Sequence, residues 1–521
     1  MGVVPLIALR PLQNAPFVDD WTYAWSVEHL LETGEVRILD WSTSLNVVHV
    51  LWGALFCLPF GFSFSALRLS TWVASLLALL GLHSLLRALG ASRRDALIGI
   101  ALLGFYPIYF ILSFSFMTDV PFLTAVTWFF WALVRACRTS APGALVWPVL
   151  LASVAMGIRP VGIFLAGALC LTLVVHPNWK GDLARRLLFA VVPVLVVLLC
   201  LLLAREHLTE HRADLTWITN SPTWRMARLS QGLLRLHQWL GVNFALVVGT
   251  LGVALTPLAL GTVSKESLRT AGPMVVVVGV GLLATVLVGW NAALPLEHGS
   301  TWSLHELAVA ESLVGMPPDR RLPAWWPVGA RVVTTLMLCL ALAPVVRGGV
   351  AKDAMPLVWG IAGYFVLTAV LWFFHDRYVL PLLVMVVALR LGTRPLVRPK
   401  LALLGLSVFA TVSMLGTWDH LQYNRALWNA VTSAQRMGIP QGELDGGYVV
   451  NGWLLYAHPE HALRTSTGDV RVPWINEGAT QRYAIVNGVP LGARVLHTEG
   501  YRRLVAPSGA LYLVDRVPGA P

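Results

Sequence analysis

Long apolar runs separated by short polar loops account for most of the 521 residues of this chain. Runs of about 18–22 apolar residues are long enough to cross a bilayer as helices. Such spans are predicted over 67–89, 96–112, 118–134, 145–156, 161–175, 187–204, 242–260, 274–290, 328–345, 356–374, 379–391 and 401–415. The segments 145–156 and 161–175 are shorter than the other predicted spans and form a pair. Residues 1–10 are interpreted as the end of an earlier, incomplete transmembrane helix. The pattern predicts an all-α polytopic membrane protein with about 12–13 transmembrane helices.

Two shorter apolar segments precede the first complete span. Residues 21–33 have a partial apolar face, and residues 46–60 are apolar but end in Pro59-Phe60-Gly61. Both are too short or too polar to span, so we interpret them as helices that lie at the membrane interface.

Positive charge falls in alternate loops between the predicted spans. The basic residues that mark these loops include Arg87, Arg93, Arg94, Arg135, Arg138, Lys180, Arg185, Lys265, Arg347, Arg394 and Lys400. Short basic loops belong in the cytoplasm. The long loops 13–45, 205–241 and 291–327, and the tail, then lie on the extracytoplasmic side. We therefore expect a multi-pass protein of a bacterial-type inner (plasma) membrane.

Composition narrows the class of protein further. The chain is 56% hydrophobic and only 12% charged, and its mean hydropathy of +0.68 is far from that of a soluble domain. The net charge of +11 comes mostly from the short loops, so no nucleic-acid partner is expected. The five cysteines form no C-x-x-C zinc pattern, and no glycine-rich phosphate loop stands out.

The tail, 418–521, is predicted to be a small α/β soluble domain that follows a membrane domain over 1–417. Residues 424–437 read as a helix, and 448–450, 483–486 and 511–514 read as short strands. A turn at 507–509 is expected to pair the last strand with 502–505. Because the tail contains no catalytic constellation, a supporting or acceptor-guiding role is expected.

Charged residues beside the apolar runs are the candidates for chemistry. Asp19 and Asp20 lie among aromatics in Phe17-Val18-Asp19-Asp20-Trp21-Thr22-Tyr23, and Asp119 opens a span. Ionisable groups at membrane depth cost roughly 2.5–3.5 kcal/mol on insertion scales, so they usually face a cavity or a partner. Two solvated loop acids are the simpler alternative for the pair, and a helix N-cap is the simpler alternative for Asp119.

Candidate phosphate-binding residues are predicted on the same membrane side. Arg159 lies between two short apolar runs, and His375, Arg377 and Tyr378 lie between two spans. A solvated turn and an interface-anchoring Arg-Tyr pair are the simpler alternatives. Together, however, the mixture suits a reaction centre, because a carboxylate accepts a proton and the planar guanidinium fork holds a phosphate.

The two adjacent acids are expected to differ in role. Asp19 precedes the predicted 21–33 helix and is free to act as a general base, whereas Asp20 is better placed to cap that helix. Asp20→Asn should therefore cost little unless Asp20 touches substrate or a metal. A divalent metal is allowed but not required, and its ligands are unknown.

These motifs resemble the GT-C superfamily of polyprenyl-phosphate-dependent glycosyltransferases. Within it, the chain resembles glycosyltransferase family 39, the protein O-mannosyltransferase and lipid A aminoarabinose transferase branch, over about 15–392. The family's first acid, its catalytic base, maps to Asp19, and the acid that opens the fourth span maps to Asp119. A small-residue run ending in Arg-Pro maps to 157–162. An Arg-Tyr-x-x-Pro motif maps to 377–381.

The resemblance implies a polyprenyl-phosphate-linked sugar donor, an inverting reaction, and an acceptor hydroxyl on a lipid, glycan or protein of the envelope. The pair is Asp-Asp where the mannosyltransferases have Asp-Glu, which leaves the role of Asp20 open. A secondary transporter and a non-catalytic envelope-assembly protein are the alternative classes of function. A secondary transporter would show internal repeats and charges at mid-depth, and a non-catalytic envelope-assembly protein would need no converging charges.

Overall fold

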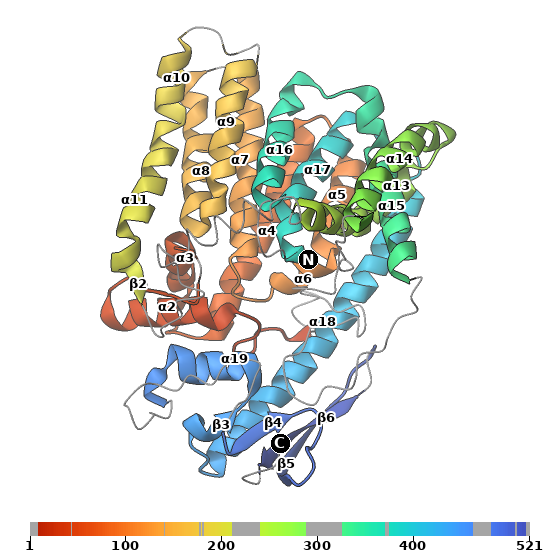
Figure 1. Ribbon diagram of the computed structural model, residues 1–521. Coiled ribbons are helices and arrows are strands. Elements are labelled where there is room, and N and C mark those ends of the chain that lie inside the picture. The colour runs from red at the N-terminus through yellow and green to blue at the C-terminus, as the bar shows by residue number, and fades with distance from the viewer. Residues whose placement is uncertain are drawn as a thin grey trace.

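The computed structural model describes residues 9–42, 44–139, 141–176, 179, 182–210, 240–287, 326–369, 375–461, 481–505 and 508–516 (Figure 1). The expected end of a first helix lies mostly outside these residues, as do most of the two long loops predicted at 205–241 and 291–327.

Apolar helices occupy the places where the sequence predicts spans. They are α4 (Phe64–Ala88), α5 (Arg93–Phe105), α6 (Pro107–Leu112), α7 (Asp119–Thr139), α8 (Val146–Ile158), α9 (Ile163–Val175), α10 (Leu183–Ala190), α11 (Val192–Leu208), the helix Leu240–Ala254, α13 (Thr256–Thr262), α14 (Lys265–Leu287), α15 (Trp326–Gly348), α16 (Met355–Ala369), α17 (Leu380–Thr393) and α18 (Pro399–Arg436). The all-α membrane architecture with a small strand-containing C-terminal region is confirmed.

The length of these helices varies around what a bilayer requires. Among the described residues, six are long and apolar enough to span, with α10 and α11 together as one of them. Leu240–Ala254 and α13, bent by 62°, would make a seventh. The other helices at predicted span positions, such as α8 and α9, are shorter than 18 residues. The expected span over 96–112 is broken into α5 and α6, because Pro107 lacks an N–H and restrains Tyr106 to an extended conformation.

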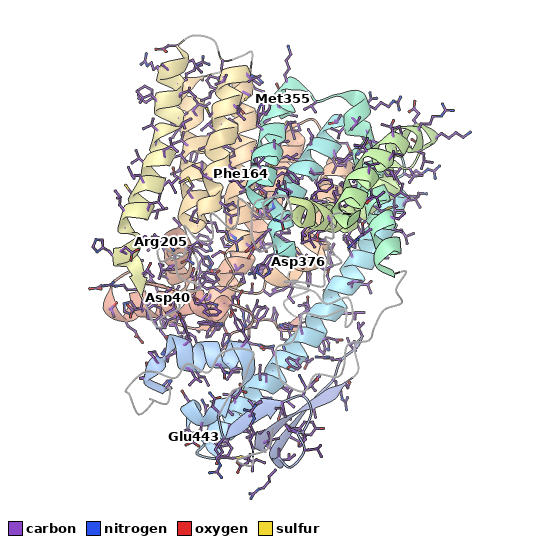
Figure 2. The ribbon with its side chains drawn as sticks, in the orientation of Figure 1. Asp40, Phe164, Arg205, Met355, Asp376 and Glu443 are labelled. Atoms are coloured by element: carbon purple, nitrogen blue, oxygen red, sulfur yellow. The ribbon has the colours of Figure 1, made fainter. Side chains whose placement is uncertain are left out.

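The basic loops lie together at one end of the helices. Arg138 donates to Asp353 at 2.7 Å, Arg347 donates to Glu266 at 2.6 Å, and Arg94 reaches the carbonyl of Leu396 at 3.5 Å. These contacts join loops that the charge pattern predicts to share one membrane side. In Figure 2, Met355 marks this end, whereas Asp40 and Asp376 lie near the opposite end, toward the tail.

Two short helices cover the end of the bundle that faces the tail. They are α2 (Asp20–Thr33) and α3 (Val47–Cys57), close to the predicted bounds of the two interfacial helices. A two-residue strand, β1 (Ile38–Leu39), pairs in parallel with β2 (Thr209–Glu210). Figure 1 shows α2 between the apolar helices and the C-terminal elements, so its residues can contact both.

The last span continues into the tail without a break. Helix α18 runs through Trp418, where a domain boundary was predicted, and includes the expected 424–437 helix. The later part of α18 packs through Ala426, Ala430 and Ala434 against the strands of the tail. A boundary drawn at 417/418 therefore cuts one continuous helix.

The tail contains a four-stranded sheet in the order β3-β4-β6-β5. Its strands are β3 (Leu444–Asp445), β4 (Tyr483–Val486), β5 (Arg494–Tyr501) and β6 (Gly509–Asp515). β3 and β4 are parallel, and the other neighbours are antiparallel. The predictions at 483–486 and 511–514 are confirmed. The partner of the last strand lies earlier than predicted, over Arg494–Tyr501 instead of 502–505.

The strand predicted at 448–450 is wrong. These residues form the short helix α19 (Gly447–Asn451), followed by the helical turns Gly452–Ala457 and Pro459–His461. The β-branched pair Val449-Val450 suggested a strand, but local bonds decide otherwise. Asp445 accepts from the Gly447 N–H at 3.1 Å and from the Asn451 amide at 2.8 Å, which closes the chain into a turn.

Candidate active site

The Asp19–Asp20 stretch begins α2 at the point where that helix meets the bundle. Asp19 is the residue immediately before the helix, and its side chain makes no capping hydrogen bond. Val18 has a positive φ of 56°, a conformation that is costly for a β-branched residue. The neighbouring packing holds this strain directly beside Asp19, as is common at functional sites.

Asp19, Asp119, Arg159 and Arg377 form one connected ion-pair network, although they lie far apart in the sequence. Arg377 Nη2 lies 3.2 Å from Asp19 Oδ2, and Arg377 Nε lies 4.0 Å from Asp119 Oδ2. Arg159 Nη2 lies 2.8 Å from the same Asp119 oxygen. Two carboxylates and two guanidinium groups balance in charge, which lowers the cost of burying them.

Burial distinguishes the two acids of this network. The side chain of Asp119 is 2% exposed, whereas that of Asp19 is 26% exposed. Asp119 is therefore enclosed beside the two guanidinium groups, and Asp19 is the more exposed carboxylate of the network. Thr118 supports this arrangement, because its hydroxyl accepts from Arg159 Nε at 2.7 Å.

Asp20 does not cap α2, in contrast to the prediction. Its side chain is fully buried, accepts the Phe17 N–H at 2.8 Å and lies 3.8 Å from Arg68 Nη2. Burial raises the pKa of Asp20 to about 7, although the Arg68 guanidinium opposes that shift. A pKa near neutrality would suit a general base, but no substrate can reach a carboxyl without exposed surface. Asp20 thus lies buried behind Asp19, with the Phe17 N–H and Arg68 as its neighbours.

Arg68 explains how the segment before Asp19 is fixed. Its buried guanidinium donates to the carbonyls of Pro11, Gln13 and Ala15, with 2.6 Å to Gln13. These bonds tie the chain that leads into Asp19 to helix α4. The Asp20–Arg68 pair therefore fixes the position at which helix α2 begins.

The remaining predicted residues lie beside the cations. The Arg159 guanidinium is 6.0 Å from the ring of Tyr378, at the outer range of a cation–π contact. His375 meets the same ring edge-on at 5.3 Å. The hydroxyl of Tyr364 donates to the Tyr378 carbonyl at 3.0 Å, which holds the segment that carries Arg377.

Sequence reasoning missed two aromatic residues that complete the surroundings of Asp19. The Tyr448 hydroxyl, from α19 in the tail, donates to Asp19 Oδ1, and the Trp41 indole N–H donates to the Tyr448 oxygen at 2.9 Å. Burial and the negative charge of Asp19 raise the pKa of Tyr448 well above its ordinary value, so its hydroxyl keeps its proton. The tail thus reaches the candidate site directly.

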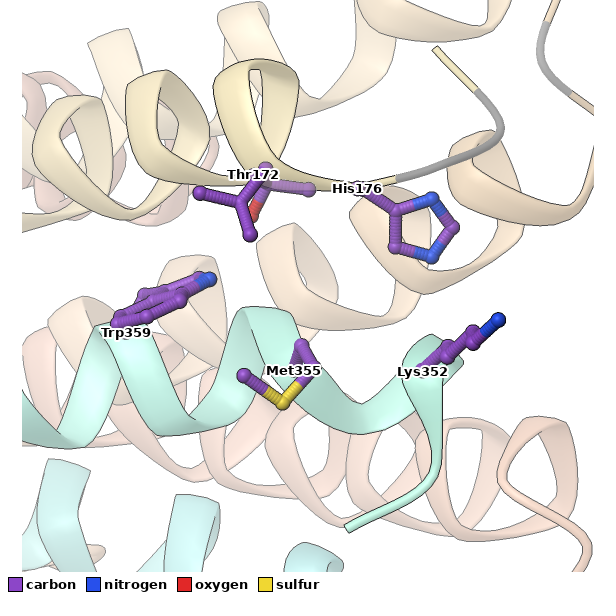
Figure 3. A pocket seen from close by; sticks show the side chains of 6 residues that line it. Thr172, His176, Lys352, Met355 and Trp359 are labelled. Atoms are coloured by element: carbon purple, nitrogen blue, oxygen red, sulfur yellow. The ribbon is translucent and has the colours of Figure 1, made fainter.

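Two other features bear on cofactors and cavities. The described residues contain no group of three or more His, Cys, Asp or Glu side chains placed to hold a metal ion. A cavity of about 220 Å³ lies between α9 and α16, lined by Thr172, Val175, His176, Lys352, Met355 and Trp359 (Figure 3). It lies at the other end of α9 from Arg159, about 20 Å along the helix, and is separate from the site.

The segment that carries half of the network matches a known family. Residues 48–204 match the family model described as dolichyl-phosphate-mannose-protein mannosyltransferase. The match includes Asp119 and Arg159, and the contacts above bring Asp19 and Arg377 to them from outside the matched segment. The expected resemblance to the GT-C glycosyltransferases is confirmed, and an enzyme is favoured over a transporter or an assembly protein.

Comparison with solved structures returns ArnT from Cupriavidus metallidurans, in the apo state and bound to undecaprenyl phosphate. The two crystal structures are similar to this chain with 15% and 14% sequence identity and a TM-score of 0.40 in both cases. The alignments cover 99% of this chain and 96% and 97% of the ArnT chains. No curated protein sequence matches.

Proposed function

We propose that the protein transfers a sugar from a polyprenyl-phosphate donor to a hydroxyl group of an envelope lipid, glycan or protein. The observation that carries the proposal is the pairing of Asp19, the more exposed acid, with Arg377 inside a charge-balanced network. The family model that matches residues 48–204 is named for a polyprenyl-phosphate sugar donor, which supports this class of substrate.

Asp19 is the general base in this proposal. The acceptor oxygen forms its bond to the anomeric carbon while its proton passes to Asp19. The bond between that carbon and the phosphate oxygen breaks, and its electron pair leaves with the phosphate. Since the oxygen attacks opposite the leaving phosphate, the reaction inverts the anomeric configuration.

The charge of Arg377 links the proton transfer to Asp19 with the departure of the phosphate. In the resting site its guanidinium is balanced by Asp19 at 3.2 Å and by Asp119. Protonation of Asp19 removes one negative charge as the departing phosphate gains one. Arg377 is then available to the phosphate, and a fixed cation stabilises charge that develops in the transition state.

Arg159 and Asp119 hold Arg377 in place and add a second cation for the donor phosphate. The polyprenyl chain would lie against the apolar helices in contact with the bilayer. The site lies at the opposite end of the helices from the basic loops. Because short basic loops favour the cytoplasm, this end and the tail are assigned to the extracytoplasmic side.

A deletion strain tests the proposal and identifies the acceptor. Mass spectrometry of its envelope lipids, glycans and proteins should show one component that lacks a sugar mass. Wild-type protein should restore that mass, and Asp19→Asn at equal membrane abundance should not. An unchanged envelope in the deletion strain would refute the proposal, and restoration by Asp19→Asn would refute the base.

A further inference from the structure

We propose that Tyr448 is a positioning residue of the active site, through which the C-terminal domain orients the Asp19 carboxylate for catalysis. The inference rests on the proposed role of Asp19 as the base and adds a residue from a part of the chain to which the sequence assigns no chemistry. Tyr448 lies 429 residues after Asp19, and its hydroxyl donates to Asp19 Oδ1.

The direction of this hydrogen bond follows from its third member. An indole N–H is only a donor, so the Tyr448 oxygen accepts from Trp41 Nε1, 2.9 Å away. The Tyr448 hydroxyl hydrogen is thereby directed to Asp19. The Asp19 carboxylate is held on both sides, with Tyr448 on Oδ1 and Arg377 Nη2 on Oδ2 at 3.2 Å.

These two contacts fix the plane of the Asp19 carboxylate without occupying all of its hydrogen-bond acceptor positions. A carboxylate has about four lone-pair directions, so one remains on each oxygen for an acceptor hydroxyl. Because the Asp19 side chain is 26% exposed, an acceptor hydroxyl can reach the carboxylate. Tyr448 therefore orients the base and leaves it able to take a proton.

The turn that carries Tyr448 is itself locked. Gly447 has φ 76°, which favours glycine, and its N–H donates to Asp445. Asp445 also accepts from Asn451 at 2.8 Å and from Arg516 Nη2 at 3.0 Å. These bonds connect the Tyr448 turn to the sheet of the tail, so its hydroxyl is held by the fold of the domain.

The tail also fits closely against the helix that Asp19 precedes. A Cβ at Gly452 would overlap the ring of Trp21 in α2. Trp21 meets the rings of Tyr448 and Tyr456 edge-on, at 6.2 and 5.7 Å. Trp41 packs against the same two tyrosines. This aromatic cluster fixes the distance between the tail and Asp19.

Tyr456 provides a matched control across the same interface. Its hydroxyl donates to Asp40 Oδ1 at 2.5 Å, and its ring packs in the same cluster. Tyr448→Phe and Tyr456→Phe each remove one hydroxyl group of the tail that donates a hydrogen bond to a carboxylate outside the tail. Only Tyr448→Phe removes the donor to Asp19.

The test measures kcat, KM and the pH dependence of transfer for the full-length protein in proteoliposomes, with a polyprenyl-phosphate-linked sugar as donor. Tyr448→Phe should lower kcat by roughly tenfold with little change in KM, because a catalytic group that is no longer held in its reactive geometry loses rate by up to about 10²-fold. A donated bond favours the charged form of an acid. For Tyr448→Phe, the acid limb of the pH profile of kcat should therefore move to higher pH. Tyr456→Phe should show the same pH profile as the wild type.

The outcomes separate this inference from the proposed function. A Tyr448→Phe protein with the kcat and pH profile of Tyr456→Phe would overturn the positioning role, whether or not Asp19→Asn is inactive. A fully active Asp19→Asn protein would overturn the base itself. If Tyr448→Phe fails to reach the membrane, Trp41→Phe provides the second variant. It removes the bond that directs the Tyr448 hydroxyl and should shift the profile in the same direction by less.

Discussion

Replacement of Arg377 by lysine tests whether the site needs the geometry of the guanidinium group or only its positive charge. In Arg377→Lys the positive charge stays, but a single ammonium cannot reproduce the two directions of the guanidinium fork. The fork now points Nη2 at Asp19, 3.2 Å away, and Nε toward Asp119, 4.0 Å away. Lysine can keep one of these partners and must release the other.

The expected loss follows from one charge-assisted hydrogen bond. Such a bond is worth about 1.5–3 kcal/mol, and about 1.36 kcal/mol in a barrier is a factor of ten in rate. Arg377→Lys should therefore lower kcat/KM for the lipid-linked donor by about 10- to 150-fold. Arg377→Ala should lower it further, because the variant also loses the charge that balances the departing phosphate.

The assay varies donor and acceptor separately in proteoliposomes. Arg482→Lys is the control, since Arg482 makes a two-pronged contact with Asp515 at 3.0 Å for each arm, in the tail. It should behave as wild type. A wild-type kcat/KM in Arg377→Lys would refute the two-directional role of this guanidinium. An Arg377→Lys protein impaired only in acceptor use would refute its assignment to the donor phosphate.

Two further predictions concern the buried charges around the site. Asp20→Asn keeps the acceptor for the Phe17 N–H, so the variant should fold and retain transfer. The folded-state pKa of Asp20, about 7, lies above its ordinary value of 3.8, so the stability that this group contributes is present below pH 3.8 and is lost as the pH rises through 7. Melting temperatures in detergent should therefore shift in favour of Asp20→Asn between pH 5 and 8, and a constant difference would contradict the burial argument. Arg159→Ala leaves Asp119 without its 2.8 Å partner and should destabilise the protein by about 3–5 kcal/mol; adding Asp119→Asn should recover part of this loss in melting experiments, and strictly additive losses would contradict the pairing.

The membrane fold and most of the charged network were predictable because a bilayer imposes simple rules on sequence. Apolar length marked the helices, and the cost of charge at membrane depth marked Asp119, Arg159 and Arg377. Their convergence with Asp19 followed from the prediction that all four share one membrane side. The contacts between the basic loops at the other end agree with that prediction.

The errors arose where local propensity competed with tertiary contacts. Asp20 has the sequence context of a helix cap, but burial against Arg68 determines its role. Val449 and Val450 favour a strand, but the bonds of Asp445 to Gly447 and Asn451 make a helical turn. Tyr448 had no signal in the sequence, because no spacing rule connects it to an acid 429 residues earlier.

Single-turnover transfer by Asp19→Asn tests directly whether Asp19 is the general base. The variant keeps the size of the side chain and one of its two hydrogen-bond acceptors but removes the proton acceptor. At equal membrane abundance, with donor binding retained, the transfer rate should fall by about 10²- to 10⁴-fold, the usual contribution of a positioned general base. Asp20→Asn, measured beside it, should stay active. A fully active Asp19→Asn protein would show that Asp19 is not the base, and an inactive Asp20→Asn protein beside it would move the base to Asp20.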